Sequence, residues 1–195
     1  MRYLLLLYFF TYCLISFGQN SVDTIYRNYT NIDELNIYTH YGVKLTKYCD
    51  SLSKYEIEIP NWLTLKETNN VSMWGGLFPA INGIENAFLI TSYPKKKYDS
   101  FNDFKRIYLA GNVFGKPTLY SSEHIWYGQH KIENIENGVQ QRVFIFWKNH
   151  IYHDKFVLIE TPSSYLWIQF TSTPDTYDKN IAKFEELMKG FKILK

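Results

Sequence analysis

The residue types best able to do chemistry in this chain lie close together in the segment WKNHIYHDKF, residues 147–156. His150 and His153 are three apart, and Asp154 follows directly. Two imidazoles and a carboxylate are ligands that zinc accepts and groups that acid–base catalysis uses. In an extended strand, however, residues three apart point to opposite faces of the sheet. The two imidazoles therefore cannot bind one metal ion unless the chain turns sharply between them.

The sequence around these histidines is typical of strands, since FIFW precedes them and FVLIE follows. We therefore predict a β-hairpin that joins residues 139–147 to residues 155–160, with its turn at 148–150 and both imidazoles exposed. No serine of the sequence stands in a recognisable nucleophile motif, so a catalytic triad with His153 and Asp154 is not predicted.

Other motifs that carry chemistry are missing from the sequence. It contains no G-x-S-x-G elbow, phosphate-binding glycine loop, H-E-x-x-H or paired C-x-x-C. Cys49 lacks an adjacent histidine, and Glu56 and Glu58 alternate with apolar residues as on the solvent face of a strand. We expect a protein that is not an enzyme, with no catalytic residues, no bound metal and no cofactor.

The first eighteen residues have the pattern of an export signal. Arg2 precedes an apolar run that ends in Ser16-Phe17-Gly18. The run is shorter than the roughly 20 residues that span a bilayer, so we expect cleavage between Gly18 and Gln19 and no transmembrane segment in the mature chain. The predicted location is the periplasm or the medium.

The charge of the chain argues against nucleic acid as a partner. Its net charge is +2, and its densest basic cluster is Lys95-Lys96-Lys97. A nucleic-acid interface needs a basic stripe, which the sequence lacks. The partner expected instead is a protein or a component of the cell envelope.

The hydrophobic pattern predicts an α+β fold of one domain, an antiparallel β-sheet meander flanked by helices. Residues 19–53 are polar and rich in Asn and Tyr, and we predict a weakly helical or loosely docked leader there. The domain proper is predicted over residues 54–195. Its expected strands are at 55–59, 62–66, 86–93, 118–120, 125–132, 139–147, 155–160 and 165–171, and its expected helices follow Ser100 and Pro174.

Two segments of the sequence are rich in turn residues, and one of them carries the predicted binding site. Asn137-Gly138 is typical of a tight hairpin turn. Residues 69–83, NNVSMWGGLFPAING, read as a loop that either folds over the core or forms a binding lip. If it is a lip, Trp74 and Phe78 contact the partner, with Trp126 nearby.

Both ends of the predicted domain resemble those of Mog1/PsbP-like domains. Ile59-Pro60-Asn61-Trp62 after an alternating strand is similar to their opening. The closing stretch YLWIQFTSTPDTYDKNIAKFEELMKGFKIL is similar to their last strand and C-terminal helix. The resemblance implies an α/β/α sandwich that binds or assembles other molecules, and it brings no site residues. The composition is also similar to that of exported proteins of Bacteroidetes.

These observations favour an exported, non-enzymatic binding or assembly protein of the cell envelope. A carrier of a small ligand or metal is the first alternative, and it requires a polar cavity between sheet and helix. A hydrolase with an unrecognised site is the second, and it requires a histidine and a carboxylate that meet in a cleft.

Overall fold

The computed structural model describes residues 24–27, 47–66, 72–109, 124–133 and 135–195, with the backbone alone for 24–27 and 124–128. Along the chain its elements are β1 (Thr24–Arg27), β2 (Lys47–Asp50), β3 (Tyr55–Glu58), β4 (Thr64–Lys66), β5 (Met73–Leu77), β6 (Ala87–Pro94), a 3-10 turn (Lys95–Lys97), α3 (Phe101–Leu109), β7 (His124–Lys131), β8 (Gly138–Trp147), β9 (His150–Glu160), β10 (Ser164–Ser172), α4 (Pro174–Lys189) and β11 (Phe191–Ile193).

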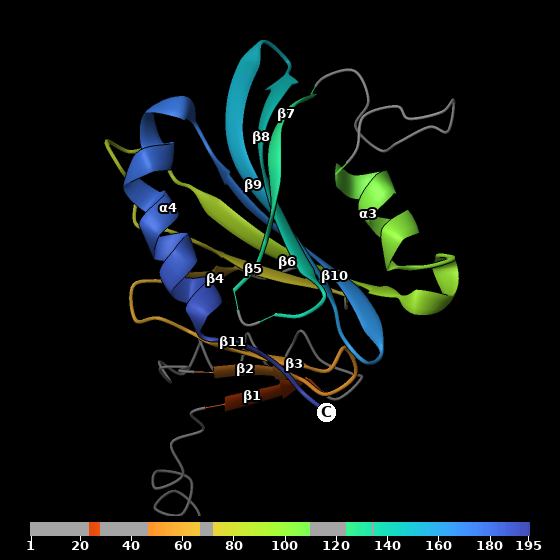
Figure 1. Ribbon diagram of the computed structural model, residues 1–195. Coiled ribbons are helices and arrows are strands. Elements are labelled where there is room, and N and C mark those ends of the chain that lie inside the picture. Colours follow the sequence, from red (N-terminus) through yellow and green to blue (C-terminus); the bar gives the residue numbers. More distant parts are fainter. Residues whose placement is uncertain (1–23, 28–46, 67–71, 110–123, 134) are drawn as a thin grey trace, which may run out of the picture.

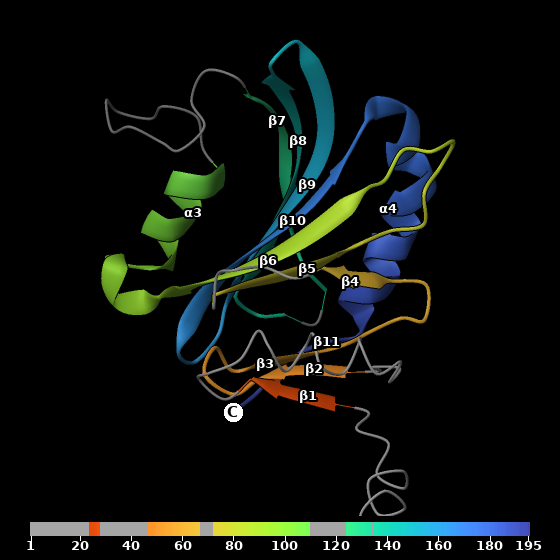
Figure 2. The same ribbon diagram turned by 180° about the vertical axis from the view of Figure 1, so that it is seen from behind.

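A seven-stranded sheet, in the order β4-β5-β6-β10-β9-β8-β7, forms the centre of the molecule (Figure 1). All its neighbouring strands are antiparallel. Helix α4 covers one face and α3 the other, as both views show (Figures 1 and 2). The predicted α+β fold with an antiparallel sheet between helices is therefore confirmed.

A second, four-stranded sheet, β1-β2-β3-β11, lies at one end of the first. Its β1 and β2 are parallel, whereas β2-β3 and β3-β11 are antiparallel. The last pair joins Tyr55 to the residues that follow α4, and the rings of Tyr55 and Phe191 stack at 5.4 Å. The C-terminal strand β11 was not predicted from the sequence.

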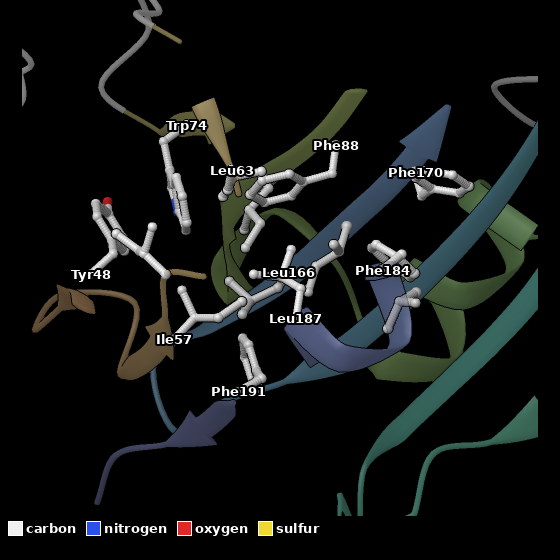
Figure 3. Packing of buried hydrophobic residues seen from close by; sticks show 14 of the residues in the cluster. Tyr48, Ile57, Leu63, Trp74, Phe88, Leu166, Phe170, Phe184, Leu187 and Phe191 are labelled. Carbon is white, nitrogen blue, oxygen red and sulfur yellow. The ribbon is translucent and has the colours of Figure 1, made fainter. Parts of the chain in front are cut away.

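The larger hydrophobic core lies between α4, the small sheet and the face of the large sheet that α4 covers (Figure 3). Phe184 and Leu187 of α4 contribute the helix face, because their spacing places them on one side of the helix. They pack with side chains of alternating positions in β6 and β10, among them Phe88, Leu166 and Phe170. A smaller core on the other face joins α3 to β8, β9 and β10.

The predicted helix after Pro174 and the predicted helix after Ser100 are both confirmed. α4 starts at Pro174 and ends before Gly190. α3 starts at Phe101, where the Ser100 Oγ accepts a hydrogen bond from the Asp103 backbone N–H at 3.1 Å. Among the described residues, neither helix is long and apolar enough to cross a membrane.

The part of the chain before residue 54 differs from the predicted leader wherever the structure describes it. Thr24–Arg27 and Lys47–Asp50 are strands, not a weak helix. Tyr48 is 3% exposed and packs in the larger core, and Cys49 is buried. The expected boundary at residue 54 is therefore too late, since the fold includes β2. The predicted signal peptide, residues 1–18, lies outside the described residues, as does the expected strand at 118–120.

Two of the glycines that suggested a loop at 69–83, Gly75 and Gly76, lie in strand β5. A Cβ on Gly75 would come within 2.2 Å of the Phe88 carbonyl oxygen, and one on Gly76 within 2.9 Å of the Thr64 oxygen. Strands β4 and β6 therefore approach β5 so closely that only glycine fits. The prediction of a loop was wrong for Met73–Leu77, because glycine serves close packing there and not a turn, whereas residues 78–83 lie in the connection from β5 to β6 and include a turn at Asn82-Gly83.

The tight turn of this sheet also lies elsewhere than Asn137-Gly138 suggested. Gly138 is the first residue of β8, and residues 132–137 connect it to β7. The two-residue turn is Lys148-Asn149, where both residues have positive φ, 46° and 65°. Two positive φ angles are typical of the type I′ turns that best join two twisted strands.

Candidate functional site

The hairpin predicted for WKNHIYHDKF is confirmed. β8 and β9 pair from Gly138–Ile159 to Trp147–His150, so the turn begins directly after Trp147. His150 is exposed and His153 is 3% exposed, so the prediction that both imidazoles are exposed is wrong for His153. Alternation along β9 places the two rings on opposite faces of the sheet, as predicted.

His153 is buried because α4 covers its face of the sheet. Its ring stacks on Tyr177 of α4 at 3.5 Å between centroids and on Phe144 of β8 at 4.2 Å. Arg142 donates a hydrogen bond from Nε to the His153 Nε2, and its guanidinium lies 4.7 Å from the centre of the Tyr177 ring. This cluster attaches the start of α4 to the hairpin.

The surroundings of His153 hold its imidazole neutral. Burial and, to a smaller extent, the positive charge of Arg142 together lower its pKa to about 4, while Asp178 acts in the opposite direction. A neutral Nε2 can accept the hydrogen bond from Arg142. The arrangement is that of a packing residue, since the ring edges and nitrogens are enclosed by protein.

Asp154 lies on the opposite face of β9, against β10. Its Oδ2 accepts hydrogen bonds from Gln169 Nε2 at 2.7 Å and from Thr171 Oγ1 at 3.0 Å. The residue is fully buried, and burial raises its pKa to about 7 despite these hydrogen bonds. Because the sheet separates Asp154 from His153, the two cannot work as an acid–base pair.

The residues predicted to bind a partner are not brought together on the surface. Trp74 and Phe78 are 3% and 2% exposed, and both belong to the larger core. Trp74 points inward, stacks on Tyr48 at 4.3 Å and donates a hydrogen bond from Nε1 to the Tyr55 hydroxyl at 2.7 Å (Figure 3). The prediction that these two side chains form a binding lip is therefore wrong, because both are buried in the larger core.

Trp126, the third predicted contact, lies on β7, where its backbone is opposite Val143. Its side chain is outside the described part of the structure. In the strand order, β7 is separated from β5, which carries Trp74, by β6, β10, β9 and β8.

A different apolar surface is exposed, at the end of the β8–β9 hairpin. Phe146, Trp147 and Ile151 are 43%, 52% and 46% exposed, which makes them three of the five exposed large hydrophobic side chains in the described part of the chain. We call residues 145–152 the hairpin tip. It rises beyond both helices in the two opposite views (Figures 1 and 2).

Strand pairing sets the directions of the tip side chains. Phe146 and Ile151 form one cross-strand pair, two residues beyond the pair of Phe144 and His153, so they point to the α4 side. Trp147 pairs with His150 and points to the α3 side. Apolar side chains are therefore exposed on both faces of the hairpin.

The tip also carries positive charge beside its largest ring. Lys148 Nζ lies 5.7 Å from the centre of the Trp147 ring, within the range of a cation–π contact. From residue 138 to residue 153 the chain contains no aspartate or glutamate. The tip can therefore meet an apolar or anionic surface without repulsion from acidic side chains of its own hairpin.

Sequence reasoning missed this surface, although Trp147 and Ile151 belong to the segment WKNHIYHDKF and Phe146 directly precedes it. The sequence feature that could have indicated an exposed apolar surface is a pair of large apolar residues next to a tight turn. At such a turn a hairpin can extend beyond the helices that cover the rest of the sheet. In the described ranges, no group of three His, Cys, Asp or Glu side chains comes together as a metal site.

Solved structures with a similar fold were compared with this one. The solution structure of cyanobacterial PsbP (CyanoP) from Synechocystis sp. PCC 6803 matches with a TM-score of 0.51 at 11% identity, over 78% of this chain and 95% of that chain. The chain has the Mog1/PsbP-like fold. At this identity the likeness concerns the fold alone.

Two further structures are similar to this one at lower TM-scores. A protein of unknown function from Pseudomonas aeruginosa, described as a putative regulator, gives 0.46 at 17% identity over 68% of this chain and 87% of that one. LpqN of Mycobacterium tuberculosis gives 0.44 at 10% identity over 72% and 83%. No protein-family model and no curated protein matches the sequence.

Proposed function

We propose that this protein is an exported, non-enzymatic binding or assembly protein of the cell envelope, and that its hairpin tip contacts the partner. The observation that carries the proposal is the exposure of Phe146, Trp147 and Ile151 at the end of a projecting hairpin. Water-exposed aromatic and aliphatic side chains that gather at one place are typical of interaction sites.

Other observations support the same function. The export-signal pattern of residues 1–18 directs the protein out of the cytoplasm. His153 and Asp154, whose side chains are of types that acid–base catalysis uses, are buried on opposite faces of the sheet and accept hydrogen bonds from neighbouring side chains. In a binding protein, these two residues need only contribute to the stability of the fold.

Site-specific cross-linking in cells of the source organism tests the proposal. A photoreactive benzoylphenylalanine is placed at Trp147 and, as the matched control, at Glu186, which is exposed on α4. We expect a discrete cross-linked product in the envelope fraction from position 147 alone. No product at 147, or the same products at 186, contradicts the assignment of the tip.

Export is tested separately by N-terminal sequencing of the mature protein recovered from the envelope or the medium. The expected first residue is Gln19. An uncleaved chain that stays in the cytoplasm contradicts the location.

A further inference from the structure

We infer that the hairpin tip binds an anionic lipid surface, with its aromatic side chains entering the headgroup region. The inference rests on the proposed function and names the component of the envelope that the tip contacts. Three observations favour a bilayer over a protein partner: the shape of the tip, the distribution of its apolar side chains and its charge.

The shape of the tip is convex. Its strands are joined by only two residues, Lys148 and Asn149, and both views show the hairpin end beyond α3 and α4 (Figures 1 and 2). A narrow projection can enter a bilayer surface without contact between the rest of the protein and the lipid. A protein partner would need a matching deep pocket.

The apolar side chains surround the tip. Phe146 and Ile151 point to the α4 side, whereas Trp147 points to the α3 side. A flat protein interface would cover one of these faces and leave the other in water. A bilayer encloses a projection on every side, so it removes all three side chains from water at once.

The charge of the tip complements anionic headgroups. Lys148 is at the turn, Arg142 lies lower on β8, and the hairpin has no acidic residue between 138 and 153. Glu133 and Glu136 lie in the β7–β8 connection, at the opposite end of β8. Below the tip, Asp154 of β9 is fully buried, and Asp178 of α4 raises the pKa of His153.

The residue types fit the interface between water and hydrocarbon. Trp is enriched there because its ring is apolar while its N–H remains hydrated. Lys148 Nζ lies 5.7 Å from the centre of the Trp147 ring, and a lysine side chain can place its ammonium group among lipid phosphates while its methylene groups stay beside apolar surface. Juxtaposed Lys and Trp at the outermost point of a hairpin therefore match the chemistry of an anionic membrane surface.

Vesicle flotation with the mature, exported protein tests the inference. The probes are vesicles of phosphatidylcholine alone and of equal parts phosphatidylcholine and phosphatidylglycerol. We expect binding to the anionic vesicles that Trp147→Ser and Phe146→Ser each weaken about tenfold, and that Lys148→Glu also weakens. Ile84→Ser is the matched control, because Ile84 is exposed, at 37%, on a turn away from the tip.

Quenching by brominated lipid gives a second readout that a folding defect does not imitate. Lipid brominated in its acyl chains should quench fluorescence of the bound wild-type protein, and Trp147→Phe should remove most of that quenching. Unchanged quenching in Trp147→Phe, or equal losses in Ile84→Ser and Trp147→Ser, overturns the inference.

The outcomes separate the inference from the proposed function. If anionic vesicles fail to bind the protein but position 147 still cross-links to an envelope protein, the lipid inference is wrong and the binding function stands. If the protein does not bind vesicles and position 147 gives no cross-linked product, the lipid inference and the proposed binding role of the tip are both wrong. Equal binding to neutral and anionic vesicles overturns the part assigned to Lys148.

Discussion

His153 and Asp154 are neighbours in the chain, yet the sheet separates their side chains. The imidazole stacks on Tyr177 of α4, while the carboxylate accepts hydrogen bonds from Gln169 and Thr171 on the other face. Burial lowers the pKa of His153 and raises that of Asp154, so in both groups it favours the neutral form. The two residues therefore make opposite contributions to the pH dependence of stability.

Asp154→Asn should stabilise the protein more at pH 8 than at pH 5. The pKa of Asp154 is about 7 in the folded protein and lower in the unfolded chain, so its favourable contribution is lost as the pH rises through 7. Between these pH values we expect the difference in unfolding free energy between variant and wild type to change by roughly 2–3 kcal/mol. Urea denaturation at both pH values measures it.

Any fixed cost of the asparagine amide cancels in this comparison between two pH values. Asp99→Asn, at an exposed position before α3, is the control and should change little. The same offset between Asp154→Asn and wild type at pH 5 and pH 8 contradicts the buried-carboxyl explanation.

His153 should titrate with a midpoint near pH 4. Since its folded pKa is lower than the ordinary value of 6.5, its contribution to stability is present above pH 6.5 and is lost as the pH falls toward 4. Arg142→Gln removes a positive charge beside the ring, so the pKa of His153 should rise. The chemical shift of the ring Hε1 proton against pH reports both values, and a wild-type midpoint near 6.5 would show that the ring is hydrated.

Trp74→Ala and Trp147→Ala should differ strongly in their effect on stability. Trp74 is buried among Tyr48, Tyr55 and Phe88, so its truncation should cost about 3–5 kcal/mol of unfolding free energy. Trp147 is about half exposed, and its truncation should cost roughly 0.5 kcal/mol or less. Equal losses in urea denaturation would contradict the reassignment of the binding surface from β5 to the tip.

Gly75→Ala should destabilise the sheet by about 3 kcal/mol or more, because the new Cβ meets the Phe88 carbonyl oxygen in the neighbouring strand. Gly83→Ala separates this clash from the backbone preference of glycine. Gly83 has a φ of 79° and open space around it, so alanine there should cost only about 1 kcal/mol. Thermal unfolding of both variants shows which one loses more stability. If β5 can move away from β6, Gly75→Ala should lose less than Gly83→Ala.

Regular alternation and helical spacing were enough to predict most elements. The pattern of Tyr55–Ile59 predicted β3, and the apolar stripe through Phe184 and Leu187 predicted α4. Strand parity also placed His150 and His153 on opposite faces. These features depend on local period, which the sequence carries directly.

Exposure could not be predicted in the same way, because it depends on what covers each position. Phe144 and Phe146 share one face of β8, yet Phe144 is half-buried and stacks on His153, whereas Phe146 is exposed beyond the helix. Gly75 was mistaken for a turn residue because the close approach of β6 comes from tertiary structure. The reach of a helix and the approach of a neighbouring strand are long-range properties.

The pairing of β3 with β11 has a consequence for synthesis. Tyr55 and Ile57 leave the ribosome early, but the strand that pairs with them, Phe191–Ile193, follows every other described element. A nascent chain therefore cannot complete its small sheet until residue 191 is available, and until then the ring of Tyr55 lacks Phe191. Such late closure leaves β3 without one of its two neighbouring strands during translation, which is compatible with the export that we propose.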